Sequence, residues 1–202
     1  MAIYFSADHH FGHKNIPRLA GRPWSDVDEM NEDLIDIWNS KVAPGDMVYY
    51  VGDFSLSMKA LALVPRLNGE IILIAGNHEE CWTGHRDAGK AARALARYEA
   101  SGLAEVHPSG RLQMSLGDMD VLVSHLPYYG DSRHDERYVD LRPKDEGLPI
   151  ICGHVHGAWR AYGGNGRSHR GQVNVGVDVW DFAPVSEEAV IEEIRRARGA
   201  AS

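Results

Sequence analysis

Cysteine, long apolar runs and positive charge are all scarce in this chain of 202 residues. The two cysteines, Cys81 and Cys152, are too few for a disulfide framework, which favours a reducing compartment. No apolar run approaches the roughly 18 residues that span a bilayer, and the apolar start of the chain lacks the basic residues of a signal peptide. These absences predict a cytoplasmic protein without a membrane segment.

The shortage of positive charge limits the partners that the protein is expected to have. The chain carries 29 Asp and Glu residues against 21 Lys and Arg residues, a formal net charge of −8. A protein that coats nucleic acid needs a broad basic surface, and this balance does not predict one. Small anionic substrates remain possible, because bound dications can reverse the local field.

The remaining composition is that of an ordinary globular protein. Hydrophobic residues make up 44% of the chain and charged residues 25%, which excludes disordered and fibrous classes. A chain of this length buries about two-thirds of its unfolded surface. With neither an internal repeat nor a linker-like segment in view, we expect residues 1–202 to form a single domain.

Apolar runs of strand length alternate with helical patterns in the first half of the chain. Strands are predicted at Ile3–Ala7, Met47–Val51 and Ile71–Ala75, and helices at Ser25–Val42, Leu61–Leu67 and Arg86–Ala100. Ser25 is the expected N-cap of the first helix. The second half predicts a hairpin of Arg111–Leu116 with Met119–Ser124, strands at Ile150–Cys152 and Val173–Val175, a helix at Ser186–Arg198, and surface loops at 130–147 and 163–166. This order indicates an α/β fold with two packed mixed sheets flanked by helices.

Polar residues that bind metals or transfer protons follow five of the predicted strands. They are Asp8-His9-His10, Gly52-Asp53, Gly76-Asn77-His78-Glu79, Ser124-His125 and Gly153-His154-Val155-His156. Any one of these segments alone is more simply explained as a turn, a helix cap or a packed histidine. In open α/β sheets, however, ligands bind beyond the carboxyl ends of the strands. Five such segments at the same topological place therefore predict one converging site.

The donor types at these strand ends select the metal. Two carboxylates, one carboxamide and four imidazoles, with no thiolate, favour Mn, Fe, Zn, Co or Ni over a structural zinc or a calcium cage. Seven donors are too many for one ion but suit two ions that share a carboxylate. Two dications about 3.5–4 Å apart are the usual arrangement for hydroxide attack at phosphorus. The seven candidates are Asp8, His10, Asp53, Asn77, His125, His154 and His156.

With these motifs in this order from residue 8 to residue 156, the chain resembles the calcineurin-like metallophosphoesterase superfamily. The segments Asp8-His9-His10-Phe11-Gly12-His13-Lys14-Asn15 and Val175-Gly176-Val177-Asp178-Val179-Trp180 are similar to those of small, uncapped bacterial and phage-type members. The resemblance implies a four-layer αββα sandwich and a metal-dependent phosphoester hydrolase.

The resemblance also implies a role for each residue of the motifs. Asp8, His10, Asp53 and His156 would hold one metal ion, and Asp53, Asn77, His125 and His154 the other, so that Asp53 bridges. His78 would act on the leaving group as general acid or electrostatic stabiliser. Two divalent transition-metal ions are expected, with Mn²⁺ the first choice and Fe, Zn, Ni or Co as alternatives.

The second motif departs from the family pattern. Many relatives continue it as Gly-Asp-x-x-Asp, often followed by Arg, whereas this chain has Leu56 and Ser57 at those two places. The usual partner of His78 and the usual phosphate-binding arginine are therefore missing. This departure argues against a protein phosphatase and leaves open which residue orients His78.

Residues outside the motifs supply further candidates. His13 is a candidate for substrate contact, since it follows the first motif closely. Arg133 and Arg137 belong to a mixed-charge run that either contacts phosphate or forms a solvated face. His9 and Asp178 are candidates to lie behind the metal ligands, with a polar position at the sheet edge as the alternative for His9.

The leading functional hypothesis is a phosphodiesterase acting on small substrates such as nucleotides or cyclic nucleotides. A nuclease or a nucleic-acid end-processing phosphatase is the alternative, although no added strand-binding domain is evident. A noncatalytic scaffold of the same fold is a third hypothesis. The presence of His78 together with all seven candidate ligands argues against it.

Overall fold

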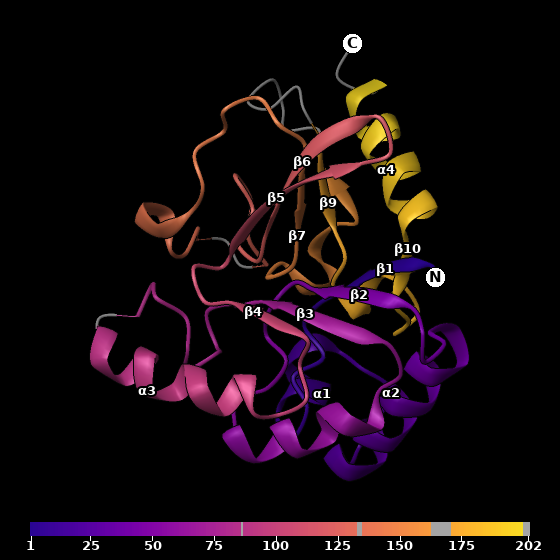
Figure 1. The fold of residues 1–202 in the computed structure, drawn as a ribbon. Coiled ribbons are helices and arrows are strands. Elements are labelled where there is room, and N and C mark those ends of the chain that lie inside the picture. Colours follow the sequence, from indigo (N-terminus) through magenta and orange to yellow (C-terminus); the bar gives the residue numbers. More distant parts are fainter. Residues whose placement is uncertain (86, 133–134, 163–170, 200–202) are drawn as a thin grey trace.

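Two mixed five-stranded sheets flanked by helices form the protein, as the sequence predicts (Figure 1). The computed structural model describes residues 1–85, 87–132, 135–162 and 171–199. The first sheet has the order β10-β1-β2-β3-β4. Its strands are β1 (Ile3–Ser6), β2 (Met47–Tyr50), β3 (Glu70–Ile74), β4 (Glu105–His107) and β10 (Val185–Ser186). β1 to β4 run parallel and β10 is antiparallel to β1, so the carboxyl ends of four strands share one edge.

The second sheet has the order β5-β6-β7-β9-β8. Its strands are β5 (Arg111–Leu116), β6 (Met119–Ser124), β7 (Ile150–Cys152), β8 (Ala161–Tyr162) and β9 (Gln172–Asn174). β6, β7 and β9 are parallel, whereas β5 and β8 pair antiparallel at the two edges. The parallel centre again brings the carboxyl ends of neighbouring strands together.

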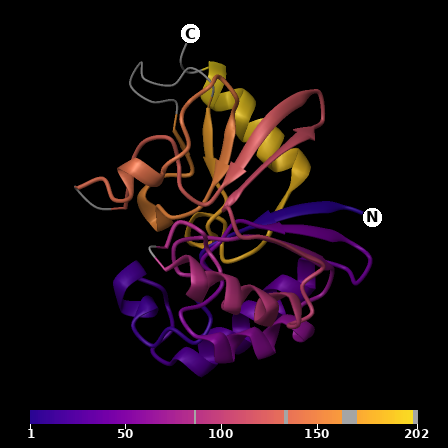
Figure 2. The same cartoon turned by 60° about the vertical axis from the view of Figure 1, so that its left-hand side comes forward.

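Four α-helices accompany the sheets within the described residues: α1 (Ile16–Ala20), α2 (Val27–Lys41), α3 (Ala88–Glu99) and α4 (Glu187–Gly199). Short 3₁₀ segments lie at Met58–Arg66, Val139–Leu141, His156–Ala158 and Val177–Val179. Figures 1 and 2 show α1, α2 and α3 on the far side of the first sheet from the second, with α4 beside the second sheet. None of the described helices combines the length and the apolar character needed to cross a membrane.

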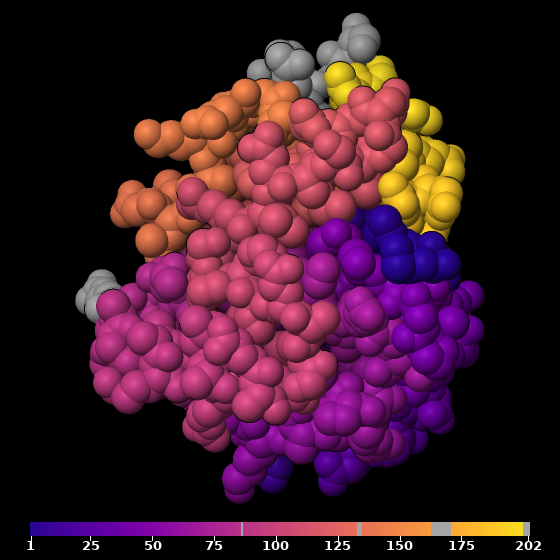
Figure 3. All heavy atoms as spheres, in the orientation of Figure 1, coloured from indigo at the N-terminus to yellow at the C-terminus, as the bar shows by residue number. Residues whose placement is uncertain are grey.

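Two hydrophobic clusters hold these layers together. The first packs the helices against the first sheet, with Trp38 of α2 and Tyr98 of α3 buried against Leu73 of β3. The second lies between the sheets and includes Phe5, Val123 and Ile151, joined by Val190 and Ile194 of α4. The early and late parts of the chain therefore form two halves of one continuous body (Figure 3).

Several predicted boundaries need correction. The helix expected at Ser25–Val42 is α2, and its N-cap is Asp26, whose extended backbone lets the carboxylate accept from the amides of Asp28 and Glu29. The helix expected at Leu61–Leu67 is a 3₁₀ segment, Met58–Arg66, with Pro65 inside it. The predicted surface loop 130–147 contains a short 3₁₀ turn and buried side chains. The predicted loop 163–166 lies outside the described residues.

Candidate metal centre and active site

The structure gathers the candidate ligands where the two sheets meet. Asp8 follows β1, Asp53 follows β2 and Asn77 follows β3, all at one edge of the first sheet. The second sheet delivers three histidines to the same place: His125 after β6, and His154 and His156 after β7. The two halves touch directly, because the amide of His154 donates to Asp8 Oδ2 at 2.9 Å.

Left-handed backbone is concentrated at these residues. Eight of the described non-glycine residues have a positive φ, and five of them are candidate ligands: Asp8, His10, Asp53, His154 and His156. A side chain with a Cβ adopts this conformation at a cost of about 1–3 kcal/mol, and the surrounding structure must hold it there. The fold therefore keeps the ligand turns in conformations that the isolated residues would avoid.

The first ligand cluster consists of Asp8, His10 and His156. Each offers one donor atom, and the three atoms lie within 4.8 Å of one another. His10 Nε2 is 3.9 Å from Asp8 Oδ1, and the rings of His10 and His156 are stacked with centroids 5.2 Å apart. One carboxylate oxygen and two imidazole nitrogens facing a common point are suitable ligands for a transition-metal dication.

The second cluster combines Asp8, Asp53 and His125 within the same 4.8 Å limit. Asp53 Oδ2 lies 3.3 Å from His125 Nε2 and 3.7 Å from His10 Nε2, so it stands between the two clusters. Asn77 Oδ1 lies 3.2 Å from His125 Nε2 and adds a neutral oxygen. Asp53 Oδ2 thus lies between the imidazoles of the two clusters, while Asp8 belongs to both, so a bridging role for Asp53 stays a prediction.

His154 lies at the margin of this group rather than inside either cluster. Its ring is perpendicular to that of His125, with centroids 5.4 Å apart. Its Nε2 is 3.2 Å from Asp131 Oδ2, which leaves Nδ1 as the nitrogen available to a metal. The sequence analysis missed Asp131, which lies behind a candidate ligand inside a segment predicted to be a surface loop.

Unpartnered buried atoms show that the residues fit a bound cation. Among the described side chains, Asp8 Oδ1 and both ring nitrogens of His10 are buried without a hydrogen-bond partner. A buried polar atom without a partner costs about 1–3 kcal/mol. Asp8 Oδ1 and the lone pair of the neutral His10 ring need an electron-pair acceptor, and a divalent metal ion is one.

Burial and neighbouring charges shape the protonation of the site. Burial raises the pKa of Asp8 to about 6. Burial acts on Asp53 in the same direction, but His125, His10 and His78 outweigh it and hold the pKa of Asp53 well below its usual range. Burial lowers the pKa of His10 and takes that of His154 to about 4, which keeps both imidazoles in the neutral form that binds metals.

Glu79 fixes the turn that carries Asp53. Its buried carboxylate accepts from the amide of Asp53 at 2.8 Å, from that of Phe54 at 2.7 Å and from that of Gly76 at 2.6 Å. The amide of His78 donates in turn to Asp53 Oδ1 at 3.0 Å. The second and third motifs are thus one hydrogen-bonded unit.

Arg22 and Asp178 hold the first cluster in position by hydrogen bonds. Arg22 is buried and donates through Nε to Asp178 Oδ1 at 2.7 Å and through Nη2 to the carbonyl of Asp8 at 2.6 Å. Asp178 Oδ2 lies 2.8 Å from His156 Nδ1, which directs Nε2 of that ring toward the cluster. Asp178 therefore lies behind the candidate ligand His156, as predicted. The sequence analysis missed Arg22 because it lies outside every motif.

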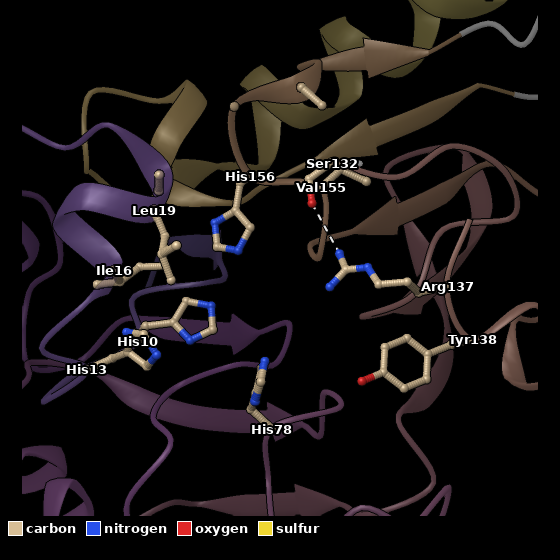
Figure 4. A pocket seen from close by; sticks show the side chains of 13 residues that line it. His10, His13, Ile16, Leu19, His78, Ser132, Arg137, Tyr138, Val155 and His156 are labelled. Atoms are coloured by element: carbon tan, nitrogen blue, oxygen red, sulfur yellow. Dashed lines mark hydrogen bonds between the residues drawn. The ribbon is translucent and has the colours of Figure 1, made fainter. Parts of the chain in front are cut away.

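A cavity of about 610 Å³ opens over the first cluster (Figure 4). His10, His13, His78 and His156 line its polar side, and Ile16, Leu19 and Ala20 of α1 form an apolar wall. Ser132, Arg137 and Tyr138 close the opposite side. His78 Nε2 is 3.7 Å from Asp53 Oδ2, and the side chain is 37% exposed, so it can meet a bound ligand.

The candidates outside the motifs fall in different places. His13 and Arg137 both line the cavity, and Arg137 is paired with Asp131 while 30% of its side chain is exposed. Substrate contact stays a prediction for both. Arg133 lies outside the described residues. His9 is fully buried, with its Nδ1 2.8 Å from the Tyr50 hydroxyl and its ring stacked on Phe11. Its carbonyl accepts from Arg22, which also holds the carbonyl of Asp8, so a position behind the ligands stays a prediction.

Comparisons with known proteins agree with this geometry. Residues 1–177 match the calcineurin-like phosphoesterase superfamily domain. The gene 66 protein of Mycobacterium phage L5 is 32% identical over 187 residues, which cover 88% of this chain and 86% of that protein. The uncharacterised protein MJ1445 of Methanocaldococcus jannaschii is 29% identical over 201 residues, 97% of this chain and 93% of that protein. The crystal structure of AQ665 from Aquifex aeolicus, a protein of unknown function, has a TM-score of 0.67 at 24% identity and covers 95% of this chain and 98% of that chain, which shows a shared fold.

The chain belongs to the calcineurin-like phosphoesterase superfamily and is a phosphoester hydrolase. The family is metal-dependent, and the two clusters of candidate ligands lie together at the strand ends where such a centre is expected. The resemblance drawn from the sequence motifs is thereby confirmed. The assignment of individual ligands to individual ions stays a prediction.

Proposed function

We propose that this protein is a phosphodiesterase for small substrates, such as nucleotides or cyclic nucleotides, that works with two divalent transition-metal ions. The observation that carries the proposal is the position of Asp53, whose Oδ2 lies within 4 Å of both His10 and His125. When bound, the metal pair supplies a water-derived nucleophile and the positive charge that neutralises the phosphoryl oxygens. Mn²⁺ is our first choice among the five metals that mixed oxygen and imidazole donors without thiolate can hold.

The protein residues divide this work between binding and proton transfer. Asp8, His10, Asp53 and His156 would hold one ion, and Asp53, Asn77, His125 and His154 would hold the other. His125 has its pKa raised to about 10: burial alone would lower it, but the negative charges of Asp53 and Asp8 prevail. The negative charges that hold a proton on the His125 ring would also attract a dication, which would replace that proton.

His78 is the general acid of the proposed reaction. It lines the cavity, reaches Asp53 with its ring and is one of the more exposed groups of the site. From this position it donates a proton to the departing oxygen as the bond to phosphorus breaks. Leu56 stands where relatives carry the orienting aspartate, and the acidic atom near His78 is Asp53 Oδ2, 3.7 Å from Nε2 and beyond hydrogen-bond distance.

A hydrolysis assay with controlled metal content tests the proposal. The protein freed of metal and then given Mn²⁺ is expected to hydrolyse bis(4-nitrophenyl) phosphate, and a chelator is expected to abolish the activity. The same assay with a 4-nitrophenyl monoester and with cyclic nucleotides ranks the substrate classes. Undiminished hydrolysis in the presence of the chelator, or no hydrolysis of any diester with any of the five metals considered, would overturn it.

A further inference from the structure

The loop that closes the cavity opposite α1 presents one arginine to the site. Arg137 lines the cavity, and its guanidinium enters it from the side facing Ile16 and Leu19 (Figure 4). The described residues that line the cavity include this one arginine and no lysine. Phosphoryl oxygens are bound best by such a planar donor group, whose N–H groups point in fixed directions.

Asp131 holds this guanidinium from behind. Its carboxylate is completely buried and accepts from Arg137 Nη2 at 2.6 Å and from Arg137 Nε at 3.1 Å. Nη2 also donates to the Ser132 hydroxyl at 3.1 Å. Nη1 has no hydrogen-bond partner among the described residues, so one edge of the guanidinium is anchored and one nitrogen remains to meet a ligand.

The anchor is shared with the metal site. Asp131 Oδ2 also accepts from Arg142 Nη2 at 3.1 Å and lies 3.2 Å from His154 Nε2, on the ring assigned to the second ion. Arg142 is buried and ties the loop down through the carbonyls of Gly130 and Arg137. One carboxylate therefore sets the position of the arginine relative to a predicted metal ligand.

The backbone next to Arg137 is strained in a way that supports a built site. Tyr138 has a φ of 56°, in the left-handed region that bulky residues avoid. Its ring lines the cavity and contacts the rings of His154 and Trp82, with centroids 5.7 and 6.1 Å away. These contacts hold the turn that directs Arg137 into the cavity.

We propose that Arg137 binds a non-bridging oxygen of the substrate phosphoryl group through Nη1, and that Asp131 positions it for this contact. The proposal rests on the phosphodiesterase activity proposed above and names a residue that would favour diesters. Arg137 stands in for the arginine that the second motif lacks, but it comes from a different loop.

The charge of this group selects a diester. The positive charge of Arg137 is already partly balanced by Asp131, and one free nitrogen meets one oxygen. A phosphodiester carries a single negative charge, whereas a monoester carries close to two at neutral pH. Metal ions would neutralise phosphoryl charge in either ester, but the described residues of the cavity offer no further Lys or Arg for the second charge of a monoester. The protein side of the cavity therefore matches a diester better.

Two readouts on the Mn²⁺-loaded protein test this assignment: the kinetics of bis(4-nitrophenyl) phosphate and the calorimetric Kd of diethyl phosphate, an unreactive monoanion. Arg137→Ala is expected to raise both KM and Kd about 10- to 100-fold, the loss of one hydrogen bond to a charged group, with a smaller change in kcat. Added guanidinium ion is expected to restore part of the lost affinity. Arg137→Lys is expected to give KM and Kd values between those of the wild type and of Arg137→Ala, because it keeps the charge but loses the planar group that Asp131 holds.

Arg111→Ala is the matched control. Arg111 donates to the carbonyl of Leu141 in the same loop but does not line the cavity, so both constants are expected to stay within twofold of the wild type. Should Arg137→Ala fail to fold, Arg137→Gln provides a second neutral variant for the same measurements. The proposal is overturned if the neutral variant keeps KM and Kd within twofold of the wild type. A wild-type protein that binds diethyl phosphate through Arg137 but hydrolyses no diester would instead overturn the proposed function alone.

Discussion

At the scale of single residues, the site depends on left-handed backbone conformations that residues with a Cβ rarely adopt. Asp8, His10 and Asp53 all have left-handed backbone, although each carries a side chain that makes this conformation costly. Glycine would relieve the strain but supplies no metal ligand. The chain accepts the cost where a ligand leaves a strand end at a sharp angle, and glycine precedes Asp53 but neither Asp8 nor His10.

His78 gives the sharpest test at this scale. His78→Ala is expected to lower kcat about 10²- to 10⁴-fold, because the departing oxygen loses its proton donor. The loss is expected to shrink for 4-nitrophenyl esters, whose leaving group needs little protonation, and to be largest for alkyl esters. Steady-state kinetics across a series of leaving groups, with metal content measured on the same samples, checks this.

The metal content of His78→Ala distinguishes two explanations for its lost activity, the loss of a general acid and the loss of a metal ligand. Both ions are expected to remain, since His78 is not among the predicted ligands, and His78→Asn serves as a polar control with a similar loss of kcat. An equal loss across all leaving groups would contradict the role of general acid. A loss of one metal ion would instead make His78 a ligand.

At the scale of elements, the close approach of three strand ends sets which residues are tolerated between them. A Cβ at Gly76 would lie 2.5 Å from Asp53 Oδ1 and 2.8 Å from both the Asp53 nitrogen and His125 Cγ. Gly52 approaches the same place from the neighbouring strand, where a Cβ would lie 2.7 Å from the Gly76 backbone. The glycines before the ligands are there because two backbones and an imidazole share one small space.

Gly76→Ala is therefore expected to damage both the fold and the site. The added methyl group forces Asp53 and His125 apart, which should lower the free energy of unfolding by about 2–3 kcal/mol and remove most of the activity. Chemical denaturation and the diesterase assay measure the two effects. Gly45→Ala is the control, since a Cβ there meets no atom within 4 Å; similar behaviour of the two variants would contradict the packing argument.

Elements with a strong local pattern are the ones that the sequence predicts well. The hairpin of β5 and β6 and the strand β7 have the expected bounds, because turn residues and apolar runs mark their ends. α1 and the short strands β4, β8 and β10 were missed, because two to five residues carry too little periodicity to be recognised. Their positions are decided by tertiary contacts rather than by local preference.

The same distinction holds for the site. The candidate ligands were found because several strand ends with the same chemistry converge, a pattern that survives in the sequence. Arg22 and Asp131 were missed because each acts through contacts with residues far away in the chain: Arg22 with Asp178, and Asp131 with His154. Only the folded structure shows that these charged side chains are buried behind predicted ligands.

At the scale of the whole molecule, the candidate metal centre joins the two sheets. Asp8, Asp53 and Asn77 belong to the first sheet and His125, His154 and His156 to the second. A direct hydrogen bond, from the amide of His154 to Asp8, already crosses between them. Metal ions held by both groups would add bonds that the unfolded chain cannot form, so binding should stabilise the folded state.

Metal loading is therefore expected to raise the Tm by roughly 5–10 °C when free Mn²⁺ is about 100 times its Kd. Calorimetry of the metal-free and Mn²⁺-loaded protein measures the shift. Asp53→Ala should lose most of it, because the residue that stands between the two clusters is gone, whereas Asp36→Ala, at an exposed position of α2, should keep it. A full shift in Asp53→Ala would mean that the ions bind without joining the sheets through this carboxylate, and the two-ion arrangement would then have to be abandoned.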